Sequence, residues 1–381
     1  MIFTAIDCDS EAAMKLASFN VENLFLRAKA LNKANFSEGK DILKAQADLN
    51  RILGKARYTA ADKTRIVDLL DQLGLKKSDD GPFAVLRQNR GDLVKRSGGK
   101  VTIVADGRED WIGWVDLKVE EVNETATRNT ARVITDLGAD VLGVVEAESR
   151  PALVRFSKNV LPAVAGKPYD HIMLVDGNDE RGIDVGLMTR KGFEIVSIVS
   201  HVDDADDEGV IFSRDCAQYE LTTANDNRLI LLINHFKSKG YGSPASSNAR
   251  RKRQAARTAA IYRALRQQHN EYIAVIGDFN DTPDSDPISP LFHQTGLKDI
   301  SELPGFHDDG RPGTYKNGTA SNKIDYILLS PELFAKATAG GILRMGVWGG
   351  KNGDLFPHYP EITKAAEAAS DHAAIWAELD I

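Results

Sequence analysis

Acidic, amide and histidine side chains recur in this sequence directly after short apolar runs. Asp278 and Asn280 follow the run 272–276, and Glu146 follows the run 141–145. A carboxylate at the end of a buried strand is costly unless a partner compensates its charge. Several such groups in one chain therefore indicate that they meet around a cation and a reaction.

Several carboxylate and amide side chains are candidate metal ligands. Asn20 and Glu22 lie one residue apart, so they point to one face of an extended segment and could bind a divalent cation. The alternative is the polar outer face of an edge strand. Glu146 is a candidate ligand of a hard cation, against a solvated strand end or a buried ion pair. Glu148 is a weaker candidate than Glu146.

The candidate reaction groups follow later strands. Asp278 offers an acceptor and Asn280 both a donor and an acceptor, which suits holding a water beside a phosphoryl oxygen; an Asx turn is the alternative. His372 is the best general-base candidate because its ordinary pKa lies near neutral. Asp325 is the candidate partner that orients it. The alternative is a capping aspartate and a packed histidine.

A third set of residues could contact an anion. His235 precedes Lys237 in a glycine-containing loop, although a lone strand-end histidine is often structural. Arg181 could hold a phosphate, and Asp184 could hold Arg181 or a histidine. The basic cluster within 250–257 is either a solvated helix face or a contact to a phosphate backbone.

The elements that must position these residues are strands with helices interleaved singly or in pairs. This pattern predicts an α+β fold with helices outside sheets. We expect a catalytic domain at 14–381, a short leader at 1–13, and an inserted subdomain at 27–128 after the first strand. Within the insertion, Asp106-Gly107 predicts a turn between paired strands. The expected strands include 15–19, 141–145, 184–189, 229–233, 273–276, 324–329, 373–379 and the inserted pair 101–105 and 111–119.

Composition narrows the class of protein. The chain of 381 residues has a formal net charge of -7, which weakens a polyanion-binding interpretation without removing it. Two cysteines without metal-binding spacing, and an N-terminus without a signal-like apolar region, predict a cytoplasmic protein. No run reaches the roughly 18 apolar residues of a membrane span, so no stable membrane insertion is expected.

Taken together, the segments resemble the ordered motifs of the endonuclease/exonuclease/phosphatase (DNase I-like) superfamily, in particular its bacterial nuclease-like members. The resemblance implies a four-layer αββα sandwich with a large insertion after the first strand. It also implies a phosphoesterase that depends on Mg2+ or Mn2+. The motifs are Phe19-Asn20-Val21-Glu22, Val145-Glu146, Asn234-His235, Gly277-Asp278-Phe279-Asn280, Lys323-Ile324-Asp325-Tyr326 and Ser370-Asp371-His372.

The resemblance also implies a role for each matched residue. Glu146 is the main metal ligand, with Asn20, Glu22 and Asp371 around the metal or a second one. The remaining roles are water and phosphoryl positioning by Asp278 and Asn280, orientation of His372 by Asp325, and phosphate contact by His235. Either the histidine or an aspartate takes the proton of the water.

These implications leave three functions to compare. A nuclease acting on DNA or RNA is favoured by Lys237 and the basic cluster. A phosphodiesterase or phosphatase acting on a small molecule or lipid headgroup is favoured by the acidic net charge and by an insertion that could wall off the cleft. A catalytically silent binding module is disfavoured because none of the expected site positions is lost. The sequence does not predict an oligomeric state.

Overall fold

The computed structural model describes residues 13–31, 36–179, 181–240 and 243–381. Apart from Ala13, the expected leader lies outside these residues. The chain divides into two compact units. The larger unit holds 123–239 and 243–381 with the N-terminal strand, and the smaller one holds 26–122. None of the described helices is both long and apolar enough to cross a membrane.

The larger unit contains two six-stranded sheets. The first has the order β19-β20-β1-β8-β10-β9, in which β1 runs parallel to β8 and antiparallel to β20. Its strands are β1 (Met14–Asn20), β8 (Val141–Ala147), β9 (His171–Val175), β10 (Asp184–Thr189), β19 (Ala337–Leu343) and β20 (Ala374–Leu379).

The second sheet has the order β11-β14-β15-β16-β18-β17, and β15 and β16 are its parallel pair. Its strands are β11 (Glu194–Val199), β14 (Cys216–Thr222), β15 (Arg228–His235), β16 (Tyr272–Asp278), β17 (Lys298–Asp299) and β18 (Asp325–Leu329). A separate two-stranded ribbon joins β12 (Ala205–Asp206) to β13 (Gly209–Val210).

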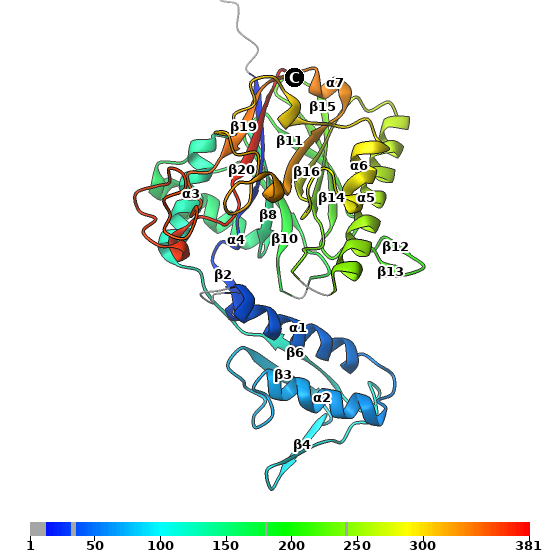
Figure 1. The fold of residues 1–381 in the computed structure, drawn as a ribbon. Coiled ribbons are helices and arrows are strands. Elements are labelled where there is room, and N and C mark those ends of the chain that lie inside the picture. The colour runs from blue at the N-terminus through cyan, green and yellow to red at the C-terminus, as the bar shows by residue number, and fades with distance from the viewer. Residues whose placement is uncertain (1–12, 32–35, 180, 241–242) are drawn as a thin grey trace, which may run out of the picture. The chain divides into compact units, whose positions relative to one another are not determined.

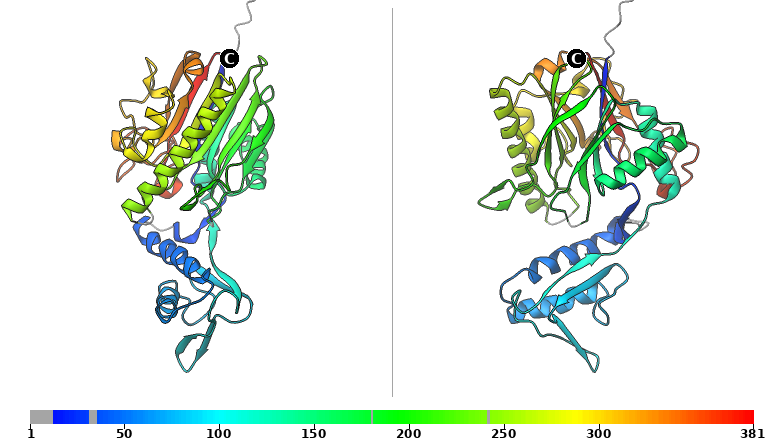
Figure 2. Two further views of the ribbon diagram at one scale, coloured as in Figure 1. Left: turned by 90° about the vertical axis from the view of Figure 1, so that its right-hand side faces the viewer. Right: turned by 180° about the vertical axis from the view of Figure 1, so that it is seen from behind.

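The two sheets pack face to face, with helices on their outer faces (Figures 1 and 2). Alternate residues of both sheets, such as Leu16 and Ile276, form the core between them. The other face of the first sheet packs on α3 (Glu124–Leu137) and α4 (Arg150–Arg155), and that of the second on α5 (Pro244–Gln267) and α6 (Ser289–His293). The expected four-layer α+β fold is therefore confirmed.

Burial on both faces explains the composition of the central strands. Strands covered on both sides read as continuous apolar runs, and every residue of β15 except Arg228 is buried. The remaining short elements are α7 (Pro331–Phe334), a π-helical turn (Phe156–Val160), and the 3-10 turns Lys29–Leu31, Pro162–Val164, Asp286–Ile288, Ile300–Glu302, Ala320–Asn322 and Ala365–Glu367.

The smaller unit has its own core of helices and hairpins, with Trp111 fully buried among them. The side chain of Thr59 caps the second helix in a capping box with Asp62. Its elements are α1 (Phe36–Leu53), α2 (Ala60–Gln72), β2 (Leu26–Ala28), β3 (Ala84–Arg90), β4 (Val94–Ser97), β5 (Lys100–Ile103), β6 (Ile112–Leu117) and β7 (Val119–Glu121).

The expected strand pair around Asp106-Gly107 is wrong. β5 pairs with β4 and β6 pairs with β3. The tight turn lies instead at Gly98-Gly99, where both residues have positive φ (56° and 77°). Two adjacent glycines reach this conformation without steric cost, so they close a two-residue hairpin that the longer 104–111 connection does not.

Candidate active site

Three ionisable side chains form a row at one end of the second sheet. His235 lies beside Asp278, and Asp278 lies opposite Asp325 on the next strand. Residues two positions earlier, Ile233 and Ile276, belong to the core between the sheets, so alternation points the row toward the first sheet. All three side chains are almost completely buried.

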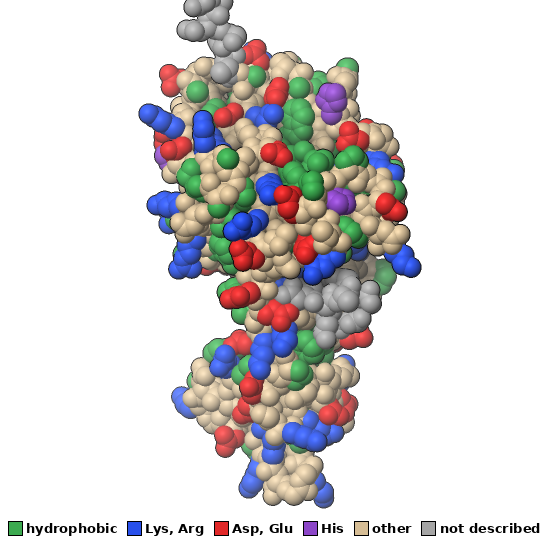
Figure 3. Space-filling model, turned by 90° about the vertical axis from the view of Figure 1, so that its left-hand side faces the viewer, with side chains coloured by type: hydrophobic (Ala, Val, Ile, Leu, Met, Phe, Trp, Pro, Cys, Tyr) green, Lys and Arg blue, Asp and Glu red, His purple; other side chains and the backbone are tan. Residues whose placement is uncertain are grey.

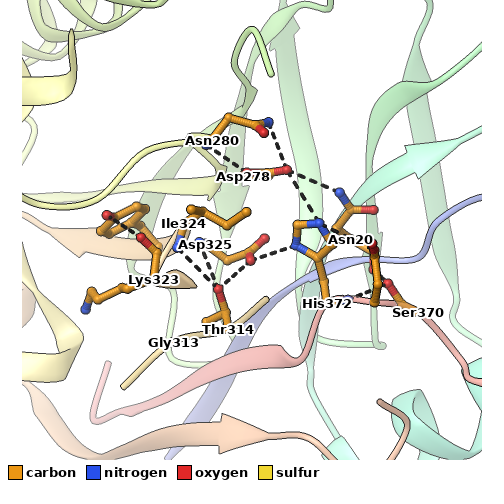
Figure 4. A network of polar contacts seen from close by, with 12 residues as sticks. Asn20, Asp278, Asn280, Gly313, Thr314, Lys323, Ile324, Asp325, Ser370 and His372 are labelled. Atoms are coloured by element: carbon orange, nitrogen blue, oxygen red, sulfur yellow. Dashed lines mark hydrogen bonds and ion pairs between the residues drawn. The ribbon is translucent and has the colours of Figure 1, made fainter. Parts of the chain in front are cut away.

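The first sheet contributes Asn20 to the same space. Its Nδ2 donates a hydrogen bond to Oδ2 of Asp278 at 3.3 Å. Asn280 donates to the same oxygen through Nδ2 at 3.0 Å and to Oδ1 through its backbone N–H at 2.8 Å (Figure 4). Two amides, one from each sheet, therefore fix the orientation of the Asp278 carboxylate.

Glu146 reaches this space because strand alternation is interrupted. Strict alternation would place it with Val144 on the outer face of the first sheet. Instead β8 gains one residue relative to β10, and Glu146 takes a left-handed φ of 65°. Its Oε1 then lies 3.5 Å from Nε2 of His235. Such bulges re-aim a side chain, and a left-handed non-glycine residue costs about 1–3 kcal/mol.

His372 is held by Asp325. Its Nδ1 lies 2.8 Å from Oδ2 of Asp325, an oxygen that also accepts a hydrogen bond from the Thr314 hydroxyl at 2.6 Å (Figure 4). The other ring nitrogen, Nε2, lies 3.9 Å from Oδ2 of Asp278. The imidazole thus joins the two carboxylates of the row.

The backbone before His372 is tied to the first sheet. The Ser370 hydroxyl donates to the carbonyl of Asn20 at 2.7 Å and accepts the backbone N–H of His372 at 3.0 Å. Tyr315 packs against the imidazole with ring centroids 4.8 Å apart. These contacts fix the ring on a loop that regular sheet pairing would not position.

Glu22 and Asp371 lie at the edge of the same cluster. The backbone N–H of Asp371 donates to Oε2 of Glu22 at 3.2 Å, and the backbone N–H of Glu22 donates to Oδ1 of Asn20 at 3.1 Å. Oδ1 of Asp371 lies 3.7 Å from Nε2 of His372. Glu22 and Asn23 both have positive φ (50° and 66°), so the chain turns sharply after β1.

Burial and mutual proximity shift the ionisation of these groups. Burial, with the Asp325 carboxylate, raises the pKa of Asp278 to about 8. Burial opposes protonation of His372, but Asp325, Asp278 and Asp371 outweigh it and hold the pKa of His372 well above its ordinary value. Burial and Arg214 hold the pKa of His235 well below its ordinary value. The site therefore favours an imidazolium at His372 and a neutral ring at His235.

The residues expected to contact an anion lie beside the His235 end of the row. Arg181 makes a bidentate ion pair with Asp179, at 2.8 Å from Nε and 2.6 Å from Nη2. Asp184 accepts a hydrogen bond from the backbone N–H of Gly177 at 2.7 Å, and burial raises its pKa to about 6. Lys237 is half-buried, two residues after His235.

The basic cluster at the start of α5 carries acidic partners. Arg251 is fully buried against Asp281, 3.0 Å away, and so is not a surface contact for nucleic acid. The other ion pairs are Lys252 with Asp286, Arg253 with Asp206 and Arg257 with Asp204. The charge of this cluster is therefore largely compensated within the protein.

Four residues of this region were missed from the sequence: Thr314, Tyr315, Asp179 and Arg214. The first two lie in a loop with no apolar run before it, so no strand-end signal marked them. Arg214 directly precedes β14, whereas the other residues were found because they follow apolar runs, so that rule did not mark it.

The donor set fits a divalent cation. Asp278, Asp325 and His372 offer buried ligand atoms that all lie within 4.8 Å of one another. Burial, with the neighbouring Asp325 carboxylate, makes the ionised form of Asp278 costly, and a bound cation offsets this cost. Hard cations such as Mg2+ prefer carboxylate and amide oxygens, and Glu146, Glu22 and Asn20 add these from the first sheet.

Comparison with known proteins agrees with this architecture. The model of the Endonuclease/Exonuclease/phosphatase family matches residues 121–372, more than half of the chain. No curated protein matches. A solved endonuclease/exonuclease/phosphatase family protein from Bacteroides thetaiotaomicron is 18% identical, with a TM-score of 0.50, covering 67% of this chain and 86% of its own.

Two further solved structures are similar at lower scores. The mannosyl-6-phosphatase Bt3783 of Bacteroides thetaiotaomicron is 18% identical, with a TM-score of 0.49, covering 67% of this chain and 91% of its own. The human Nocturnin catalytic domain with bound sulfate is 13% identical, with a TM-score of 0.46, covering 68% and 87%. At such identities the likeness concerns the fold and leaves the substrate open.

Proposed function

Because the chain belongs to the endonuclease/exonuclease/phosphatase family, we propose that it hydrolyses phosphodiesters with Mg2+ or Mn2+ and acts as a nuclease on DNA or RNA. One observation carries the proposal. The row of His235, Asp278 and Asp325 on one sheet is met by Asn20 and His372 from the other.

The two ionisable groups with opposite tasks are Asp278 and His372. Asp278 accepts the proton of the attacking water, because Asn20 and Asn280 fix its carboxylate beside the place where Asn280 can hold that water. His372, held as an imidazolium by Asp325, donates to a phosphoryl oxygen as negative charge builds on it. This assignment differs from the general-base role that the sequence suggested for His372.

The remaining residues position the reactants. Asn20 and Asn280 orient Asp278, and Asn280 keeps an amide oxygen for the water. Neutral His235 contacts the phosphate. Glu146, Glu22, Asn20 and Asp371 would hold the metal ion. Bound there, the ion offsets charge on the phosphoryl and leaving oxygens.

One observation favours the alternative, a phosphodiesterase or phosphatase acting on a small-molecule or lipid headgroup phosphoester. Four basic residues of α5 are paired with acids, namely Arg251, Lys252, Arg253 and Arg257. On the face drawn in Figure 3, acidic and basic side chains are interspersed without a large basic area. Neither that face nor these four residues of α5 therefore offers a large uncompensated basic area to a nucleic-acid chain.

A substrate panel separates the two functions. Purified protein is incubated with Mg2+ or Mn2+ and supercoiled plasmid, single-stranded DNA, RNA or bis-p-nitrophenyl phosphate, with EDTA as the blank. Nuclease action predicts nicking or shortening of at least one polymer. Cleavage of the small diester alone would contradict the nuclease function and favour the phosphodiesterase that acts on small molecules or lipid headgroups. Hydrolysis of none of them, by folded protein with metal bound, would refute the nuclease function.

A further inference from the structure

One buried arginine holds a loop, residues 308–318, that adjoins the reaction groups. Arg344 directly follows β19, and its side chain is only 4% exposed. Its guanidinium donates to three backbone carbonyls of the loop: Gly313 at 3.1 Å from Nη1, and Asp308 at 2.9 Å and Arg311 at 2.6 Å from Nη2. A buried guanidinium is costly unless its donors are paired, so these bonds hold the loop and the arginine together.

The loop contains Thr314, which contacts the pair formed by Asp325 and His372. The Thr314 hydroxyl donates to Oδ2 of Asp325 at 2.6 Å and accepts the backbone N–H of the same residue at 3.1 Å (Figure 4). Nδ1 of His372 lies 2.8 Å from that same Oδ2. A chain of contacts therefore runs from Arg344 through the loop to the imidazole.

The backbone of the loop also pairs with the segment that carries His372. The N–H of Ala373 donates to the carbonyl of Thr314 at 2.7 Å, and the N–H of Lys316 donates to the carbonyl of Asp371 at 2.8 Å. These two bonds flank His372 in the chain. A displacement of the loop would therefore move the imidazole together with Asp371, a proposed metal ligand.

The loop closes tightly on itself between Gly313 and Gly318. The N–H of Gly313 donates to the carbonyl of Gly318 at 2.9 Å, and Gly318 has a left-handed φ of 67°. A Cβ on Gly313 would lie 2.1 Å from the carbonyl oxygen of Thr319. Glycine meets both demands without steric cost. The Gly313 carbonyl that Arg344 binds thus belongs to a closed turn, so this bond holds the whole turn.

The acidic neighbour of Arg344 does not explain its burial. Nε of Arg344 lies 3.7 Å from Oδ2 of Asp309, whose side chain is 72% exposed. An exposed ion pair contributes little because solvent screens it, whereas hydrogen bonds from a charged donor are strong. The three carbonyls, rather than the carboxylate, therefore account for the position of the guanidinium.

We propose that Arg344 is a positioning residue for phosphodiester hydrolysis. Through the loop 308–318 it holds Asp325, His372 and Asp371 in the arrangement that the reaction needs. The proposal rests on the proposed phosphodiesterase function and adds to it a residue that follows an edge strand of the first sheet. Loosening the loop should therefore lower turnover more than it weakens substrate binding.

The kinetic test uses two substitutions of Arg344. Arg344→Met keeps an aliphatic side chain and removes every donor. Its kcat for bis-p-nitrophenyl phosphate with Mn2+ should fall about 10²-fold, the effect of misplacing catalytic groups by about 1 Å, while KM stays close to that of the wild type. Arg344→Lys keeps the charge without the planar fork of donors, so it should restore only part of the rate. A fully active Arg344→Lys variant would overturn the proposal.

Arg190→Met is the matched control. Arg190 also directly follows a strand of the first sheet, β10, and its Nη1 donates to the carbonyls of Lys167 and Pro168 at 2.6 and 2.8 Å. It lies beyond the end of β10 opposite Asp184, about 20 Å away along the strand. Its substitution should lower the melting temperature and keep the wild-type kcat. Similar losses of kcat in the two variants would overturn the role of Arg344.

A double variant tests whether Arg344 acts through Thr314. Each of Arg344→Met and Thr314→Val breaks the same chain of contacts. Together they should therefore lose little more turnover than the more impaired single variant, because coupled residues are not additive. Losses that multiply would contradict this route.

Hydrogen exchange separates this proposal from the proposed function, since it needs neither metal nor substrate. In EDTA, peptides that span 314–317 and 371–374 should exchange about tenfold faster in Arg344→Met, the effect of losing a hydrogen bond from a charged donor, and at the wild-type rate in Arg190→Met. If Arg344→Met does not melt cooperatively, Arg344→Lys takes its place.

The outcomes of this measurement are distinct. Faster exchange, in a protein whose wild type hydrolyses no ester, would contradict the phosphodiesterase function and support the hold of Arg344 on the loop. Unchanged exchange, or faster exchange with a wild-type kcat, would overturn the positioning role and leave the proposed function standing.

Discussion

Nδ1 of His372 donates a hydrogen bond to the carboxylate of Asp325 at 2.8 Å, across a separation of 47 residues. The same oxygen accepts the hydroxyl of Thr314, and both side chains are almost fully buried. A buried carboxylate that is paired in this way fixes the imidazole ring and favours its charged form. Asp325 therefore acts through His372, as a positioning residue.

Removing the charge of Asp325 should lower turnover through His372. Asp325→Asn is expected to reduce kcat by about 10²–10⁴. Loss of the carboxylate also lowers the pKa of His372, so the alkaline fall in activity should move to lower pH. Steady-state rates between pH 5 and 9 measure both effects. A variant with a wild-type pH profile would contradict the coupling, and Asp325→Glu should restore part of the rate.

The ionised Asp278 carboxylate should lower the stability of the metal-free protein, although turnover depends on it. Its folded-state pKa is raised by burial to about 8, above the ordinary value near 3.9. The metal-free protein therefore loses stability as pH rises from about 4 through 8, because the carboxylate ionises against its surroundings. Asp278→Asn should remove this loss while lowering turnover by orders of magnitude.

The measurement is thermal unfolding in EDTA. At pH 8 we expect Asp278→Asn to melt above the wild type by at least roughly 2–4 °C, the shift for each kcal/mol, and the difference should shrink toward pH 4. Added metal ion should raise the melting temperature of the wild type, because a bound cation compensates the charge of the Asp278 carboxylate. A variant that melts below the wild type at pH 8 would show that ionised Asp278 is not strained in the metal-free fold.

The sequence identified those residues of the candidate site that strand ends and sheet register alone bring together. Asp278 and Asp325 follow buried apolar runs, and sheet pairing aligns them without further help. Thr314 lies in a loop with no such run, so only the assembled fold brings it to Asp325. Local patterns report periodicity and turns, and loop contacts of this kind depend on tertiary packing.

Pairing inside the insertion was the part that sequence patterns misassigned. Asp106-Gly107 and Gly98-Gly99 are both turn signals, and only backbone geometry shows which one closes a hairpin. The bulge at Glu146 is a similar case. A valine-rich run followed by glutamate gives no sign that alternation will break at Glu146, one residue before β8 ends.

Glu146 and Glu148 offer a matched test of metal binding. Glu146→Gln should weaken Mn2+ binding by at least about 10–100-fold, the usual effect of losing a residue that only supports a metal ligand, because Glu146 is itself a proposed ligand. Glu148 instead accepts the backbone N–H groups of Leu24 and Phe25, at 3.0 and 2.6 Å. Glu148→Gln should lower the melting temperature and leave Mn2+ affinity unchanged. Calorimetric titration with Mn2+ measures both variants; equal affinity losses would contradict this division of roles.

The inserted unit, residues 26–122, should influence which substrate the protein cleaves. All catalytic and metal-binding residues proposed above lie outside 26–122, so this segment should affect substrate choice rather than chemistry. Its ends are paired, Leu26 with Glu121, and such partners lie about 5 Å apart, so a short linker can replace it. The shortened protein should hydrolyse bis-p-nitrophenyl phosphate within about threefold of the wild-type rate, since the order of magnitude of turnover is set by transition-state contacts. Its ranking of plasmid, single-stranded DNA and RNA should change. An unchanged ranking in a protein that still melts cooperatively would show that the insertion does not select the substrate.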